Sequence, residues 1–102
     1  MVIVSQNKNG IINFKNIETL VLIKRLNKNG VEAIQINARG NYDYNLGEYK
    51  TAERAKEIIA EITLAYSNFT YFKTATKEGK DYIINLLKHK YEKFDIYEMP
   101  KE

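Results

Sequence analysis

The chain has 102 residues, of which 44% are hydrophobic and 28% charged, a composition typical of one folded domain spanning residues 1–102. It contains no cysteine and a single histidine, His89, which excludes disulfide frameworks, thiol nucleophiles and multi-histidine metal centres within one chain. The formal net charge is +3, and the whole excess lies in the first fifty residues, where seven basic side chains outnumber four acidic ones. A charge of this size permits an acidic partner without requiring one.

No targeting or membrane segment is expected. The apolar residues 1–4 are followed at once by polar residues, so they lack the apolar run that a secretory signal needs. The longest apolar run elsewhere, residues 20–23, is far shorter than a bilayer-spanning helix. We therefore expect a cytoplasmic protein without a membrane partner.

The first fifty residues predict five strands joined by tight turns. Short β-branched segments occupy residues 2–5 and 11–14, and Asn9-Gly10 between them is a strong hairpin signal because both residues tolerate positive φ. Longer segments follow over residues 17–25 and 31–39, joined by a second Asn-Gly turn. Strands connected in this way pair as an antiparallel meander.

The fourth and fifth of these strands alternate clearly between apolar and polar residues. Ile34, Ile36 and Ala38 alternate with polar neighbours, which is the period of a strand with one buried face. The fifth strand begins at Tyr42, after a Gly-Asn turn, and runs to Tyr49. The meander therefore offers one apolar face that another element must cover.

The hydrophobic period becomes helical at Thr51, which is a good N-cap residue, and Glu53 suits the positive end of the helix dipole. We expect an amphipathic helix of about fifteen residues that covers the meander, followed by an aromatic-rich connection over residues 67–76. A second helix is predicted from Lys77 or Lys80 to Lys93. Residues 95–99 are extended in character and are expected to add an edge strand. The predicted fold class is α+β.

No catalytic arrangement is evident. The glycines stand singly at turns, whereas a phosphate-binding loop clusters them. His89 lies between two lysines, which is typical of a solvent-exposed residue. Glu53, Glu57 and Glu61 share one helical face, a spacing that usually marks the solvated side of an amphipathic helix. We therefore predict a protein that is not an enzyme, with no catalytic, metal-binding or cofactor-binding residues and no cofactor.

The chain has eight tyrosines, and tyrosine suits interfaces because it combines a flat apolar ring with a hydroxyl. Tyr42 and Tyr44 follow Arg39 across a tight turn. Cationic and aromatic groups that share a sheet surface hold single-stranded nucleic acid in many proteins. These three residues form a candidate partner surface, weighed against the simpler interpretation that the tyrosines cap the edge of the core.

Two classes of function stay open. The first is a non-enzymatic interaction module that binds another protein or itself, favoured by the tyrosine content and by exposed sheet edges that can pair with another chain. The alternative is a nucleic-acid-binding module that uses the basic N-terminal half. That alternative requires Lys24, Arg25, Lys28 and Arg39 to converge on one face with the tyrosines.

Three strings resemble those of a family of small, functionally uncharacterised proteins from bacteria and their phages or prophages. They are Val4-Ser5-Gln6, the sequence LGEYKTAERAKEI at residues 46–58, and FDIYEMP at residues 94–100. The central string is also similar to the strand-to-helix junction of bacterial pleckstrin-homology-like domains, where Gly47 and Thr51 would be turn and cap residues. Fewer strands precede the helix here than in a full barrel of that kind. The resemblance implies an architecture and a mobile-element origin, and no activity.

Overall fold

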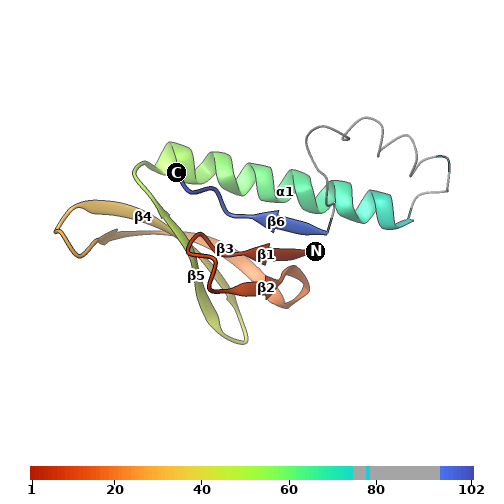
Figure 1. Cartoon of the computed structure of the whole chain (residues 1–102), viewed down its shortest axis with the longest axis horizontal. Coiled ribbons are helices and arrows are strands. Elements are labelled where there is room, and N and C mark those ends of the chain that lie inside the picture. The colour runs from red at the N-terminus through yellow and green to blue at the C-terminus, as the bar shows by residue number, and fades with distance from the viewer. Residues whose placement is uncertain (75–77, 79–94) are drawn as a thin grey trace.

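The structure is a computed structural model that describes residues 1–74, 78 and 95–102 (Figure 1). Its elements are β1 (Val2–Val4), β2 (Ile11–Asn13), the 3-10 helix η1 (Phe14–Asn16), β3 (Ile17–Leu26), β4 (Glu32–Gly40), β5 (Asp43–Tyr49), α1 (Ala52–Thr74) and β6 (Ile96–Glu98). The α+β class is confirmed. The second helix that we predicted up to Lys93, together with His89, lies in the part of the chain that the structure does not describe.

The strands form two three-stranded sheets, so the prediction of a single five-stranded meander is wrong. The order in one sheet is β3-β4-β5, with both pairs antiparallel, and the order in the other is β2-β1-β6. β1 pairs antiparallel with β2 and parallel with β6. The break falls at η1, which begins where Asn13 Oδ1 accepts a hydrogen bond from the Lys15 N–H and turns the chain away from β2. The C-terminal segment does join a sheet, as expected.

The turn between β1 and β2 is built by short polar side chains. Ser5 Oγ donates to Asn7 Oδ1 and accepts from the Gly10 N–H, while Asn7 Oδ1 also accepts from the Asn9 N–H. The positive φ in this turn belongs to Lys8, at 66°, and not to Asn9-Gly10 as predicted. Side-chain hydrogen bonds to the turn's own backbone therefore set its shape.

β3 and β4 form a long hairpin that reaches past the start of α1, as Figure 1 shows. Its turn is closed by Asn27 Oδ1, which accepts hydrogen bonds from the N–H groups of Asn29 and Val31. Gly30 has a φ of 76°, which a glycine adopts without the steric cost that a Cβ imposes. The predicted turn at Asn29-Gly30 is therefore confirmed, with the positive φ at the glycine.

The alternation predicted for the fourth strand is confirmed in β4. Ile36 and Ala38 are fully buried, Ile34 packs against the core, and Arg39 is exposed on the other face. The prediction did not include a bulge in β5. Ile36 pairs with Gly47 and Asn37 pairs with Asn45, so Leu46 between them is an extra residue. The bulge directs the Leu46 side chain into the core, where it is completely buried.

Helix α1 begins as predicted and is longer than predicted. Thr51 Oγ1 accepts a hydrogen bond from the Arg54 N–H at 3.1 Å, so Thr51 is the N-cap. The helix continues to Thr74, and residues 67–74, which we expected to form a connection, are helical. Just before this range, Tyr66 stacks on Phe14 of η1 with ring centroids 4.3 Å apart, and Phe69 within it lies beside Tyr66 with ring centroids 6.5 Å apart.

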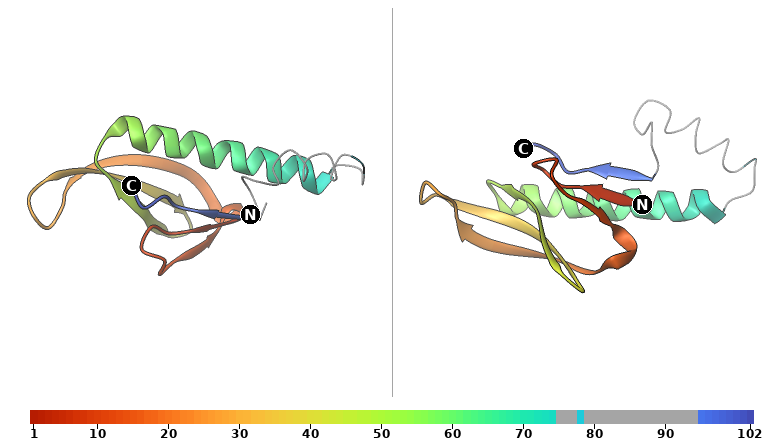
Figure 2. Two further views of the ribbon diagram at one scale, coloured as in Figure 1. Left: turned by 45° about the horizontal axis from the view of Figure 1, so that its top comes forward. Right: turned by 60° about the horizontal axis from the view of Figure 1, so that its bottom comes forward.

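The core lies where α1 covers both sheets, an arrangement that Figure 2 shows from two further sides. Side chains from three parts of the molecule fill it. The sheet β2-β1-β6 and the residue after it contribute Ile3, Ile12, Tyr97 and Met99. The sheet β3-β4-β5 contributes Ile36, Ala38, Leu46 and Tyr49, and α1 contributes Ala55, Ile58 and Ile62. The helix therefore joins two sheets that share no strand, and the hairpin end of β3 and β4 projects away from this core.

Candidate functional site

The outer side of β3 is an open sheet edge. The order β3-β4-β5 gives β3 one neighbouring strand. Among the described residues, the other backbone hydrogen bond to β3 is at its first residue, where the Ile17 N–H donates to the Phe14 carbonyl of η1. β3 is also the longest strand, with ten residues. An open edge of this length presents a row of unpaired N–H and C=O groups that another extended chain can meet.

The apolar residues of this edge are incompletely covered. Residues 20–23, Leu-Val-Leu-Ile, are all half-buried, and no residue of β3 is fully buried. Leu20 and Leu22 pack against the core, so Val21 and Ile23 lie on the opposite face by the alternation of a strand. A run that is apolar on both faces is typical of a strand inside a sheet, yet here it stands at the edge.

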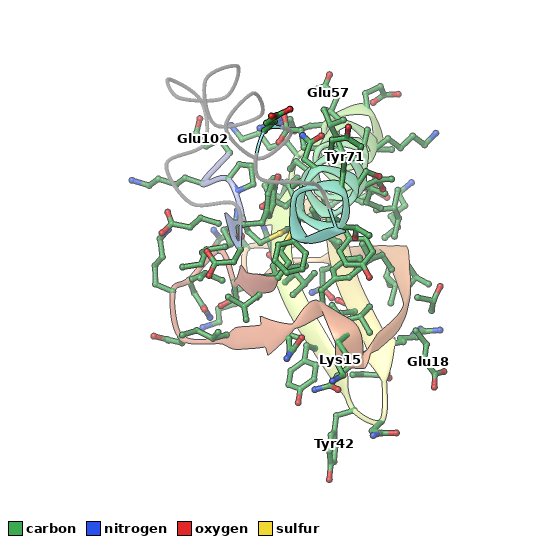
Figure 3. All side chains as sticks on the ribbon, turned by 90° about the vertical axis from the view of Figure 1, so that its right-hand side faces the viewer. Lys15, Glu18, Tyr42, Glu57, Tyr71 and Glu102 are labelled. Atoms are coloured by element: carbon green, nitrogen blue, oxygen red, sulfur yellow. The ribbon has the colours of Figure 1, made fainter. Side chains whose placement is uncertain are left out.

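Charges flank this apolar run with opposite signs at its two ends. Glu18 precedes it and is exposed, and its side chain points away from the body of the molecule (Figure 3). Lys24 and Arg25 follow it and are also exposed. Lys24 Nζ lies 3.3 Å from Glu32 Oε2 across the hairpin, with both side chains largely in solvent. The edge of β3 is therefore acidic at its start, apolar in its middle and basic at its end.

The opposite edge of the same sheet is closed. The side-chain amide of Gln6 accepts a hydrogen bond from the Glu48 N–H at 2.8 Å and donates one to the Glu48 carbonyl at 2.9 Å. The backbone N–H of Gln6 donates to the Leu46 carbonyl at 2.8 Å. Gln6 also donates to the Lys101 carbonyl at 2.9 Å. Gln6 thus occupies the position of a neighbouring strand at the middle of β5, whereas no described residue does so along β3.

A shallow depression of about 190 Å³ lies beside this closure, lined by residues Gln6, Asn7, Asn45, Leu46, Gly47 and Glu48. Several of its polar atoms already have partners within the protein. Asn45 Oδ1 accepts from the Gly47 N–H, and Glu48 Oε1 accepts from Gln35 Nε2 at 2.8 Å. These hydrogen bonds hold the bulge in β5 and the pairing of β4 with β5.

The structure does not bring the predicted surface of Arg39, Tyr42 and Tyr44 together. Arg39 pairs with Asp43, whereas Tyr44 pairs with Ala38, so Arg39 and Tyr44 lie on opposite faces of the sheet. Tyr42 is in the turn between β4 and β5, where it is 73% exposed and points into solvent (Figure 3). The prediction that these three side chains share one surface is therefore wrong.

The basic residues of the N-terminal half do not converge either. Lys24 pairs with Ile34 on the core-facing side, whereas Arg25 pairs with Ala33 on the other side. Arg39 shares the face of Arg25 but lies six strand residues from the Ala33 pair, which is about 20 Å. Asp43 stands directly opposite Arg39 and balances its charge.

A polar cluster joins α1 to the C-terminal segment. Arg54 Nη1 lies 3.1 Å from Glu57 Oε2 and 3.5 Å from Glu61 Oε1, and the Tyr97 hydroxyl donates to Glu61 Oε2. Burial raises the pKa of Tyr49 to about 12, while burial and the bond to Glu61 raise the pKa of Tyr97 further. Both phenols are therefore neutral and poor bases at pH 7. The helical carboxylates hold Arg54 and Tyr97, an arrangement that fastens the C-terminal strand.

In the described residues, no three acidic or histidine side chains are grouped so that they could bind a metal ion. The one long helix in that part of the chain, α1, lacks the apolar stretch needed to cross a membrane. No protein-family model, curated protein or solved structure matches the chain. The functional proposal therefore depends on the chain's own residues, and the open edge of β3 is its strongest candidate site.

Proposed function

We propose that this protein is a non-enzymatic interaction module that binds a protein partner by strand addition to the outer edge of β3. The observation that carries the proposal is the apolar run of residues 20–23, which is half-buried on both faces of a strand that pairs, within the described part of the chain, with β4 alone. A partner strand would cover the remaining exposed area of these side chains and pair the free main-chain groups.

The contrast between the two edges of the sheet supports this choice. Gln6 closes the β5 edge through three hydrogen bonds, which is how natural sheets avoid unwanted pairing. β3 has flanking charges but no covering segment among the described residues. Charges at the ends of an edge select a partner of complementary pattern, whereas a covering segment would exclude every partner.

The origin and location of the module form part of the same proposal. The resemblance of residues 4–6, 46–58 and 94–100 to those of small bacterial and phage proteins supports a phage or prophage origin. Action in the cytoplasm is proposed from the sequence of residues 1–4 and 20–23, which is not typical of a secretory signal or a membrane span. A nucleic-acid-binding role has less support, because Arg25 and Arg39 lie about 20 Å apart and Asp43 opposes Arg39.

Photo-crosslinking in the cells that carry the gene tests the proposal. A benzoylphenylalanine side chain would replace Ile23 on β3 in one variant and Leu64 on α1 in another. Leu64 is the matched control because it is also apolar, is 55% exposed and lies outside the sheets. We expect protein adducts from position 23 and none from position 64. Adducts from neither position, or equally from both, would contradict strand addition at β3.

A further inference from the structure

We infer that the partner strand is β3 of a second copy of this chain, paired antiparallel about a two-fold axis at Val21. The inference rests on the proposed function and names its partner. A second copy is the one occupant whose sequence can be compared with this edge directly.

Symmetry limits the registers that two copies can adopt. Residues directly opposite each other in an antiparallel pair have their side chains on the same face of the sheet. A two-fold axis perpendicular to the sheet keeps every residue on the same face in both copies, so each residue must stand opposite one from its own alternating set. The axis then passes midway between one residue of β3 and the same residue of the second copy, and the candidates are the four residues of the apolar run, Leu20, Val21, Leu22 and Ile23.

Charge and apolar matching select Val21 among these candidates. With the axis at Val21, Leu20 stands opposite Leu22 of the second copy. The end of β3 that carries Glu18, the extra residue at the irregularity, then lies beside the end that carries Lys24. With the axis at Leu22, Leu20 would face Lys24, and with the axis at Ile23, Leu22 would face Lys24. With the axis at Leu20, Leu22 would face the acidic start of the strand. Only the Val21 register pairs leucines with leucines and brings ends of opposite charge together, which is the pattern that stabilises adjacent strands.

The flanking geometry is compatible with this register. The pairing of β3 with β4 is irregular between Ile17 and Thr19, so the regular part of β3 starts at Thr19. Glu18 sits at this irregularity, and its exposed side chain points away from the body of the molecule (Figure 3). Lys24, which already lies 3.3 Å from Glu32 of its own chain, would then lie between two carboxylates.

The pairing would produce a closed dimer and not a fibre. Joining the two β3 edges makes one continuous six-stranded sheet, with the β5 strands at its outer sides. Each β5 strand is closed at Leu46 and Glu48 by Gln6, so the joined sheet cannot add further copies there. Both α1 helices lie on the same face of the joined sheet, because a perpendicular axis preserves the faces.

Light scattering on the full chain is the first test. We expect a solution mass of twice 11.9 kDa as the concentration rises, and the mass of a monomer for Val21→Lys, which places two lysines opposite each other. Ile11→Lys is the matched control, since Ile11 is 72% exposed on β2 in the other sheet, and it should remain dimeric. Circular dichroism checks that both variants fold.

Disulfide trapping tests the register without relying on the lysine variant. The chain has no cysteine, so Val21→Cys introduces a unique thiol. Directly opposite Cβ atoms lie about 4.5–5.5 Å apart, which is close to the range that a disulfide spans. We expect Val21→Cys to link to itself on oxidation. Thr19→Cys should link only to Ile23→Cys, because two copies of Thr19 would lie about 13 Å apart.

The outcomes separate this inference from the proposed function. A monomer at every concentration, with no Val21→Cys dimer, overturns the self-pairing. If crosslinks at position 23 then join the chain to a different protein, strand addition at β3 stands with another partner. Self-linking of Thr19→Cys in place of Val21→Cys overturns the register. Absence of both self-pairing and crosslinks overturns the inference and the proposed function together.

Discussion

The Tyr97 hydroxyl of β6 donates a 2.9 Å hydrogen bond to Glu61 Oε2 of α1. The other oxygen of the same carboxylate lies 3.5 Å from Arg54 Nη1, and Arg54 Nε donates to the backbone carbonyl of Glu102. The Tyr97 ring is buried in the core beside these polar contacts. The Glu61 carboxylate of α1 thus holds β6, a strand that is remote in sequence and that pairs with β1 in the sheet β2-β1-β6.

Tyr97→Phe should therefore destabilise the fold while keeping the ring in place. The variant removes one of the two partners of the Glu61 carboxylate, which is 47% exposed, so water replaces part of the lost bond and we expect a loss of about 1 kcal/mol. Urea denaturation of the variant and the wild type measures the difference. Tyr42→Phe is the matched control, because Tyr42 is 73% exposed, and it should leave the free energy of unfolding unchanged. Equal losses for the two variants would contradict the role assigned to Tyr97.

Stability should fall at alkaline pH because of the buried phenols. Burial raises the pKa of Tyr49 from 10.0 to about 12, and its hydroxyl donates to the Pro100 carbonyl at 2.7 Å. Above pH 10 the unfolded chain loses these phenol protons while the folded chain keeps them, so the free energy of unfolding decreases as pH rises toward 12. Urea midpoints measured from pH 8 upward should be flat below pH 10 and then decline. The decline should be shallower in Tyr97→Phe. A flat profile to pH 12 would contradict the burial of both hydroxyls.

Gly40→Ala should be the most damaging of the glycine substitutions at the turns. A Cβ at this position would overlap the backbone carbonyl oxygen of Asn16, which cannot move aside as a flexible side chain can. Gly30→Ala is the control, since its Cβ would meet no atom within 4 Å and its cost is only that of a positive φ, about 1–2 kcal/mol. Thermal unfolding should show a clearly larger loss for Gly40→Ala. The reverse order would mean that β4 does not pass so close to η1.

Gln6→Met should open the β5 edge. Methionine matches the length of glutamine but cannot bond to the Glu48 N–H and carbonyl, so these groups lose the partners that they have at 2.8 and 2.9 Å. We expect a loss of about 1–2 kcal/mol and faster hydrogen exchange of the Glu48 amide. Asn41→Met, an exposed polar-to-methionine change in the turn after β4, is the control and should change neither quantity. An unchanged Glu48 exchange rate in Gln6→Met would contradict the closure.

The parts of the fold that depend on neighbouring residues were predictable from the sequence. The alternation around Ile34 and Ile36 gives the buried face of β4, and Thr51 caps α1 through a bond within one turn. The parallel pairing of Val2 with Ile96 was not predictable in the same way. A period of two shows which side chains share a face, and it does not show which distant strand lies beside them.

The sequence predicted that the candidate site would be an exposed sheet edge, but it did not predict which strand forms that edge. Exposed sheet edges were expected, whereas the position of β3 at an edge follows from the separation of the two sheets at η1. The prediction that Arg39 and Tyr44 lie on one face was wrong because the turn places Arg39 opposite Asp43. Displacing a strand pairing by one residue moves a side chain to the other face. The apolar run of residues 20–23 was the signal in the sequence that could have directed attention to β3.

Amide hydrogen exchange along β3, measured at low and high protein concentration, tests most directly whether this edge pairs. Within residues 19–23, the amides that point away from β4 alternate with those already bonded to it. We predict that exchange of the outward amides slows as concentration rises, that β4 is unaffected, and that Val21→Lys abolishes the effect. Outward amides that exchange at the same fast rate at every concentration would contradict pairing of β3 with a second copy.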